Sequence, residues 1–241
     1  LQGIVSSLND LLQRLALALE GEQRFTANAA HELLTPLAAI KTEVQLCQLR
    51  LDDRQAADML ARITQRVDRA SHTVAQLLTL ARLDPDDPVA GHSVSLRLLL
   101  TRTLADVSYL ADERGLTVDL DGEGEACITG SEDLLGILLC NLLINAFRYA
   151  SEHSAVRIGL RTGERVELAI SNRCPPLSAR EFDRISERFY RAPGSSGQGA
   201  GLGLSIVARI AEQHAARMKV GPDDSGQGFC VRLDFPTAGS A

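Results

Sequence analysis

Two runs of apolar residues at heptad spacing constrain this chain more than any other feature of its 241 residues. The first run steps by 4, 3, 4 and 3 residues through Leu33, Leu37, Ile40, Val44 and Cys47. The second alternates steps of 3 and 4 through Leu60, Ile63, Val67, Ala70, Val74, Leu77 and Ala81. This spacing is typical of a coiled-coil seam on each of two helices. Because the polar break Leu51–Arg54 separates the runs, they predict a helical hairpin with a short turn.

The seam of this hairpin is narrow, so the hairpin buries too little apolar surface to be stable alone. We therefore expect it to pair with a second copy of itself in a four-helix bundle. Further apolar residues lie upstream at helical spacing, at Leu8, Leu11, Leu15 and Ala18. They indicate that the first helix begins well before His31, either as an input rod or simply as a long helix.

The segment Asp84–Pro88 ends the second run, because two prolines and three acids cannot continue a helix. It is the clearest domain boundary in the sequence, and it suits a hinge or linker. From about Ser93 the pattern becomes mixed, with expected strands at Thr117–Leu120, Ala126–Thr129, Ala155–Arg161, Val166–Ser171, Met218–Val220 and Phe229–Phe235. Helices are expected at Leu96–Glu113, Ser131–Tyr149, Ser178–Arg188 and Leu204–His214. This mixture predicts an α/β sandwich after the hairpin, and an α+β class for the whole chain.

The composition narrows the possible functions. A net charge of −6 and an aromatic content of 4% argue against a nucleic-acid binder, which usually carries a basic patch. The five cysteines are scattered and lack CxxC spacing, which argues against a disulfide framework. No apolar run approaches the ~20 residues that span a bilayer. Because the sequence begins at Leu1 rather than at Met, we expect any membrane segment to lie upstream.

A histidine followed at once by a glutamate stands in Phe25–Leu37, a segment of helical character. Thr35 follows His31 and Glu32 by about one turn, at ~3.6 residues per turn. The segment therefore gathers a nucleophile, a base and a small hydroxyl group. Read alone, it also fits a core helix with one polar turn.

A polar stripe interrupts a second apolar helix. Its residues fall at i, i+4, i+7 and i+8 and share one helix face, namely Asn141, Asn145, Arg148 and Tyr149. The residues between them are expected in the core, namely Leu142, Leu143, Ala146 and Phe147. An asparagine oxygen suits Mg²⁺ and an arginine suits a phosphate. The alternative is a solvated helix face.

Five glycines fall within the ten residues Gly194–Gly203, directly before an apolar helix. A loop of this kind exposes backbone N–H groups and the positive end of a helix dipole to anions. It suits a mobile lid, although an ordinary flexible turn is the default interpretation. In the preceding segment Glu187–Arg191, a guanidinium either reaches a terminal phosphate or belongs to a surface charge run.

Together, these motifs resemble the cytoplasmic kinase core of a bacterial sensor histidine kinase, over about residues 20–236. The hairpin resembles the dimerisation and histidine-phosphotransfer domain. The remainder resembles the ATP-binding domain of the Bergerat fold, which is shared by gyrase, Hsp90, histidine kinases and MutL. The resemblance implies a membrane-proximal signalling helix, the end of a HAMP-like linker, at residues 1–22, a phosphotransfer domain at 23–88 and a catalytic ATP-binding domain at 93–236.

The resemblance also implies an activity, ATP-dependent phosphorylation of His31 followed by transfer to an aspartate of a response regulator. His31 would be the nucleophile, Glu32 would hold and deprotonate its imidazole, and Thr35 would position water when the regulator is dephosphorylated. The implied partners are the receiver domain of the regulator and a second copy of the chain, with no nucleic acid. The implied location is the cytoplasmic region of a bacterial inner-membrane protein.

For the nucleotide end, the resemblance implies ATP and Mg²⁺ as cofactors, with Asn145 as the protein ligand of the metal. Asn141, Arg148 and Tyr149 would surround the phosphates, and Arg191 would approach the γ-phosphate. The lid hinge and phosphate loop would be formed by Gly199, Gly201 and Gly203.

The chain departs from the family pattern at three places. Leu34 stands where an arginine is usual, which alters docking between domains or the electrostatics around His31. Asn28 stands where an aspartate is frequent, a surface change of small effect. The largest departure is Ser171–Leu177, in place of an Asp-x-Gly-x-Gly loop.

In that loop, Asn172 takes the place of the aspartate that accepts the adenine amino hydrogen bond, and Cys174 and Pro176 replace glycines. An amide oxygen accepts this bond without charge, so about 1 kcal/mol of adenine selectivity is at risk. We expect ATP binding that is retained but weak. The alternative function is a kinase-weak or kinase-dead scaffold or phosphatase, whereas a purely structural coiled coil leaves residues 141–204 unexplained.

Overall fold

A computed structural model of the chain describes residues 38–42, 44, 53–83, 91–122, 124–193, 199–226 and 228–237. The chain divides into two compact units, Leu1–Leu78 and Thr79–Ala241. The predicted signalling helix, the predicted boundary at Asp84–Pro88 and most of the first helix of the hairpin lie outside the described residues.

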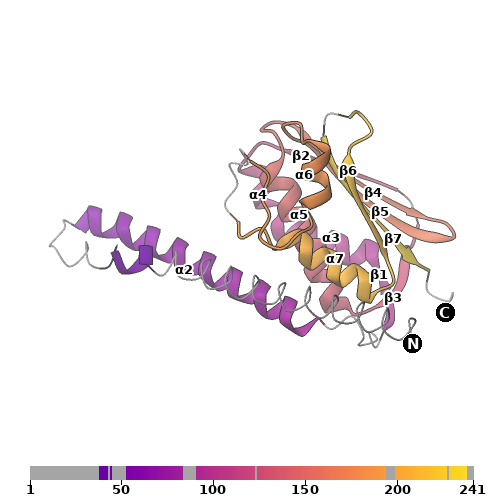
Figure 1. The fold of residues 1–241 in the computed structure, drawn as a ribbon, viewed down its shortest axis with the longest axis horizontal. Helices are drawn as coiled ribbons and strands as arrows, with labels where there is room; N and C mark the ends of the chain where they lie inside the picture. The colour runs from indigo at the N-terminus through magenta and orange to yellow at the C-terminus, as the bar shows by residue number, and fades with distance from the viewer. Residues whose placement is uncertain are drawn as a thin grey trace, which may run out of the picture. The chain divides into compact units, whose positions relative to one another are not determined.

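The second helix of the predicted hairpin is α2, Asp53–Arg82. Figure 1 shows it as one long helix. The predicted break Leu51–Arg54 was too long, because Asp53 and Arg54 are already helical. An acidic residue is favourable in the first turn of a helix, and arginine is a good helix former.

Alternate residues of the predicted seam of α2 are exposed in the single chain, whereas Ile63, Ala70 and Leu77 are half-buried. Three seam residues at seven-residue intervals, Leu60, Val67 and Val74, have exposed fractions of 59%, 44% and 38%. An apolar stripe of this kind marks an interaction surface. Its burial therefore requires a partner or another segment of the chain.

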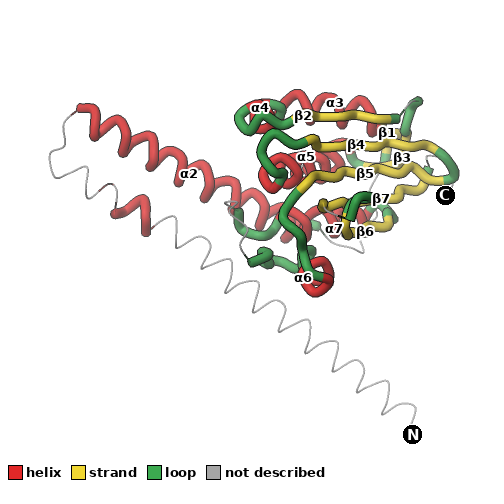
Figure 2. The backbone as a smooth tube through the Cα atoms, turned by 90° about the horizontal axis from the view of Figure 1, so that it is seen from above, coloured by secondary structure: helices red, strands yellow, loops and turns green. Residues whose placement is uncertain are grey.

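The second unit is built on a mixed sheet of five strands in the order β2-β4-β5-β7-β6. Figure 2 shows the strands side by side in this order. Their bounds are Thr117–Asp121 for β2, Ala155–Thr162 for β4, Arg165–Arg173 for β5, Arg217–Pro222 for β6 and Gly228–Pro236 for β7. β2 and β4 are parallel, and the other neighbours are antiparallel. Two short strands, β1 (His92–Ser95) and β3 (Cys127–Gly130), form a separate antiparallel pair.

A layer of helices covers one face of the large sheet, as Figure 1 shows. The layer consists of α3 (Leu96–Val107), α5 (Glu132–Tyr149) and α7 (Gly203–Gln213). Two shorter helices, α4 (Tyr109–Asp112) and α6 (Ala179–Arg184), lie between them in the sequence. Alternate residues of β5 are buried, among them Val166, Leu168 and Ile170. α5 packs against β5 and buries most of its apolar residues. The core therefore lies between the sheet and the helices, which makes this unit a two-layer sandwich.

The six predicted strands are all present, and the α+β class is confirmed. β1 was not predicted. The helix predicted at Leu96–Glu113 is broken at Ser108, whose hydroxyl donates to Ala105 O at 3.1 Å. A serine that bonds to nearby backbone competes with the helix in this way.

The helix predicted at Ser178–Arg188 was also too long, because α6 ends at Arg184. After it, an ion pair joins Arg184 NH2 to Glu187 Oε2 at 3.2 Å. None of the described helices combines the length and the apolar character that a membrane span requires.

Candidate functional site

The polar stripe predicted between Asn141 and Tyr149 lies on α5. Asn141, Asn145 and Tyr149 are half-buried and Arg148 is exposed. The expected core residues Leu142, Leu143, Ala146 and Phe147 are all buried, with exposed fractions of 3% or less. The side of α5 that carries the stripe is therefore the side that its packing against the sheet leaves accessible.

The glycine segment leads directly into α7, which begins at Gly203. The helix N-cap residue, Leu202, makes no side-chain capping hydrogen bond. The first backbone N–H groups of an α-helix have no partner within the helix. An uncapped helix start with a glycine before it is therefore suited to an anion such as a phosphate.

The polar stripe of α5 and the glycine segment lie against each other. A Cβ atom added at Gly203 would lie 3.2 Å from Asn141 Oδ1, and one added at Gly199 would lie 2.9 Å from Arg148 NH1. A side chain at either glycine would therefore displace the tip of the Asn141 or Arg148 side chain. Together these close approaches bring an amide, a guanidinium and a helix N-terminus to one place.

The segment that carries Arg191 adjoins the same glycines. The amide of Phe189 donates to Gly201 O at 2.9 Å. Gly201 has a φ of +69°, and a Cβ there would lie 2.8 Å from Tyr190 O. The guanidinium of Arg184 stacks over the Tyr190 ring, 4.4 Å from its centroid. The exposed Arg191 therefore follows a segment that is tied to the glycine segment.

Asn172 lies near the end of β5 and is only 2% exposed. Its Nδ2 donates to Arg173 O at 3.4 Å, a long bond for an amide. The amide of Ser151, just after α5, donates to Arg173 O at 2.7 Å. This bond holds the end of β5 next to the end of α5, so that Asn172 and the polar stripe belong to one region.

Burial, followed by the charge of Asp223, raises the pKa of the nearby Cys174 thiol and keeps it neutral.

Two residues at the ends of α5 were missed by sequence reasoning. Arg114 NH1 donates to Phe147 O at 2.8 Å, in the last turn of α5. At the other end, the amide of the N-cap Ser131 donates to Nε2 of the buried His214 at 3.2 Å. These contacts join residues 33 and 83 positions apart, so no local sequence signal reveals them.

The residues predicted to accept the phosphoryl group, His31, Glu32 and Thr35, lie outside the described residues.

The described ranges contain no group of three or more His, Cys, Asp or Glu side chains that could hold a metal ion. Mg²⁺ is commonly bound through few protein oxygens together with substrate phosphates. The half-buried amide of Asn145, on the stripe beside a helix start that suits an anion, fits that kind of site.

Comparisons with known families divide the chain in two. Residues 22–86 match the family described as "His Kinase A (phospho-acceptor) domain". Residues 130–239 match the family described as "Histidine kinase-, DNA gyrase B-, and HSP90-like ATPase". The second match includes every predicted nucleotide-binding residue.

Among curated proteins, the sensor protein QseC of Escherichia coli (strain K12) is 38% identical over 235 residues, which are 96% of this chain and 51% of that protein. The sensor protein kinase PmrB of Pseudomonas aeruginosa is 35% identical over 239 residues, 98% of this chain and 50% of that protein. The chain therefore spans about half the length of the curated relatives it matches.

Two solved structures share the fold at lower identity. The Acinetobacter baumannii histidine kinase AdeS has a TM-score of 0.70 at 18% identity, over 86% of this chain and 98% of that chain. The histidine kinase ThkA, solved in complex with the response regulator protein TrrA, has a TM-score of 0.73 at 18% identity, over 93% of this chain and 64% of that chain.

Proposed function

The chain belongs to the bacterial sensor histidine kinases, and we propose that it transfers the γ-phosphoryl group of ATP to His31 and then to an aspartate of a response regulator. The observation that carries the nucleotide half of this proposal is the contact of Asn141 and Arg148 with the glycines that precede and start α7. An amide, a cation and an uncapped helix N-terminus in one place suit a polyphosphate.

In this proposal the phosphates of ATP lie between α5 and the start of α7. Asn141, Arg148 and Tyr149 surround them, and Arg191 approaches the γ-phosphate from the segment tied to Gly201. Asn145 holds Mg²⁺, which supplies positive charge where the transferred group develops negative charge. The glycines Gly199, Gly201 and Gly203 form the phosphate loop and the hinge of its lid. At the end of β5, the side chain of Asn172 accepts a hydrogen bond from the adenine amino group.

At the acceptor, Nε2 of His31 attacks the γ-phosphorus, an N–P bond forms, and the bond from phosphorus to the bridging oxygen of ADP breaks. Glu32 accepts the Nδ1 proton, which keeps the Nε2 lone pair available. Because Pro36 lacks an N–H group, a helix through this segment would leave the carbonyl of Glu32 without its usual donor. Catalysis then consists mainly of positioning and charge stabilisation, as in other phosphoryl transfers.

The exposed seam of α2 supports pairing with a second copy of the chain in a four-helix bundle.

A receiver domain is the proposed partner for the second transfer, in keeping with the structural neighbour ThkA, which was solved with a response regulator. Thr35 would position water when the chain acts as a phosphatase. The chain would form the cytoplasmic region of an inner-membrane sensor protein.

A second candidate is a kinase-weak or kinase-dead scaffold or phosphatase. The observation that favours it is the end of β5 and the loop that follows, where Asn172, Cys174 and Pro176 stand in place of the aspartate and two glycines of the family pattern. Pro176 has a fixed φ and no N–H group, so this loop cannot adopt a glycine conformation there.

One experiment separates the two candidates. The chain and its His31→Ala variant are incubated with γ-labelled ATP and Mg²⁺, and the label on the protein is tested for stability. We expect an acid-labile, alkali-stable label on the unchanged chain only. An unlabelled chain that still dephosphorylates a phosphorylated receiver domain supports the second candidate.

A further inference from the structure

The last turn of α5 ends without a glycine cap. Ala150 N donates to Ala146 O at 3.0 Å, which closes the final backbone bond of the helix. The next amide, that of Ser151, donates across to Arg173 O and not to Phe147 O. The carbonyls of Phe147 and Arg148 therefore need donors from outside the helix.

Arg114 supplies those donors. Its NH1 donates to Phe147 O at 2.8 Å and also to Arg148 O. Hydrogen bonds from a guanidinium are charge-assisted, and a cation is favourable at the negative end of a helix dipole. A single side chain from the connection between α4 and β2 thus caps the turn that carries Arg148.

The backbone of Arg114 is itself held on both sides. Its amide donates to Ala111 O at 3.1 Å, and its carbonyl accepts from His153 N at 3.2 Å. The adjacent Gly115 has a φ of +60°, and a Cβ there would lie 2.5 Å from His153 Nδ1. Arg114 therefore projects from a close-packed anchor, which makes it a fixed support for the end of α5.

The Arg148 side chain extends from the capped turn to the glycine segment, where its NH1 lies 2.9 Å from the place a Cβ of Gly199 would occupy. We propose that Arg114 is a positioning residue for phosphate binding, because it fixes the backbone from which Arg148 reaches the glycine segment. This role rests on the proposed function, in which Arg148 contacts the phosphates of ATP. The guanidinium of Arg114 also adds a second positive charge, next to the backbone of Arg148.

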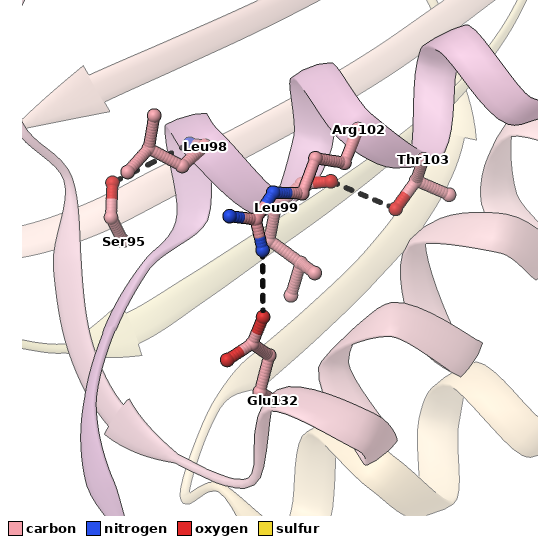
Figure 3. A network of polar contacts seen from close by, with 6 residues as sticks. All are labelled: Ser95, Leu98, Leu99, Arg102, Thr103 and Glu132. Atoms are coloured by element: carbon pink, nitrogen blue, oxygen red, sulfur yellow. Dashed lines mark hydrogen bonds and ion pairs between the residues drawn. The ribbon is translucent and has the colours of Figure 1, made fainter.

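The test compares Arg114→Met, which keeps a chain of similar length without donors, with Arg114→Lys, which keeps the charge but not the planar fork. The matched control is Arg102→Met, because Arg102 lies on α3 and contacts the opposite end of α5. Arg102 NH1 pairs with Glu132 Oε1 at 3.2 Å in the first turn of that helix, as Figure 3 shows, and both side chains are well exposed. Binding of ATP and of adenosine is measured by calorimetry on the full chain, with urea unfolding in parallel.

For Arg114→Met we expect the ATP dissociation constant to rise about three- to tenfold, the effect of weakening one charge-assisted contact. Adenosine affinity stays unchanged, Arg114→Lys recovers part of the ATP affinity, and Arg102→Met binds both ligands like the unchanged chain. If the cap only stabilises the fold, its loss lowers the free energy of unfolding and weakens ATP and adenosine binding alike. Equal losses of ATP and adenosine affinity therefore overturn the proposal, as does unchanged ATP binding. If the unchanged chain binds no ATP, the proposed function itself fails, and this role with it.

Discussion

The backbone amide of Ser131 donates a hydrogen bond to Nε2 of His214 across 3.2 Å. Ser131 is the N-cap of α5 and His214 is the C-cap of α7, so one imidazole joins the two helices that carry the candidate site. The other ring nitrogen, Nδ1, lies 2.7 Å from Ile210 O. These two bonds assign the proton to Nδ1 and leave Nε2 as an acceptor. A doubly protonated ring cannot accept the Ser131 bond.

This contact predicts a loss of stability in mild acid. Burial lowers the pKa of His214 below its usual range, and the bond with Ile210 O opposes that shift in part. The unfolded chain therefore binds a proton at a higher pH than the folded chain does. The stabilisation is complete above about pH 6.5 and falls by at most about 1.4 kcal/mol per pH unit below it, until the folded pKa is reached.

Urea unfolding of the chain between pH 5 and pH 7.5 measures this effect. We expect His214→Gln to flatten the pH dependence, and His92→Gln, at an exposed histidine, to leave it unchanged. Parallel pH profiles for the chain and for His214→Gln would show that the imidazole is not the titrating group.

A second prediction concerns the base of the nucleotide. An amide offers both an acceptor and donors, so Asn172 can pair with the adenine amino group or, rotated, with a guanine oxygen. We expect Asn172→Asp to bind ATP about fivefold more tightly, as about 1 kcal/mol implies, and to bind GTP less well. Titration of both nucleotides with Mg²⁺ measures the ratio. If the unchanged chain already binds ATP as tightly as the variant, the amide is no handicap.

Gly201 and Gly226 provide a matched pair for the glycine segment. Both have left-handed backbone, with φ of +69° and +70°. A Cβ at Gly201 meets backbone atoms of Phe189 and Tyr190 at 2.8 Å, whereas one at Gly226 meets nothing within 4 Å. Gly226→Ala should cost about 1–2 kcal/mol of stability with normal ATP affinity. Gly201→Ala should lose ATP affinity as well, and calorimetry that finds equal affinities for the two variants contradicts this.

The exposed seam of α2 predicts self-association. Val67→Glu introduces a charge into the stripe, and a buried unpaired charge is strongly unfavourable in an interface. Sedimentation should therefore show a dimer for the unchanged chain and a monomer for Val67→Glu at the same concentration. Ser71→Glu, at an exposed polar position of the same helix, is the control and should remain dimeric. A dimeric Val67→Glu variant argues for another interface.

Much of the second unit could be predicted from the sequence because its signals are local. The stripe on α5 follows from helical spacing, and Leu142, Leu143, Ala146 and Phe147 are buried as that spacing requires. β1 was missed because its four residues, His92–Ser95, carry little apolar pattern and are held by pairing with the distant β3. The break at Ser108 was missed because it depends on one hydroxyl bond.

The supports of the candidate site could not be predicted in the same way. Arg114 reads as a surface arginine in the sequence, and His214 reads as the end of a helix. Their roles come from contacts with Phe147 and Ser131, which only the folded chain brings near. The sequence therefore indicates which side chains face a ligand, whereas the residues that hold those side chains emerge from tertiary packing.

The parallel pairing of β2 with β4 has a consequence for the energetics of binding. Parallel neighbours require a crossover connection, and here α5 lies within that crossover. One wall of the site is thus a structural necessity of the sheet and loses little conformational entropy when a nucleotide arrives. The conformational entropy lost on binding therefore comes mainly from the other wall, which carries Gly199, Gly201 and Gly203. Substitutions that rigidify this wall should tighten nucleotide binding most.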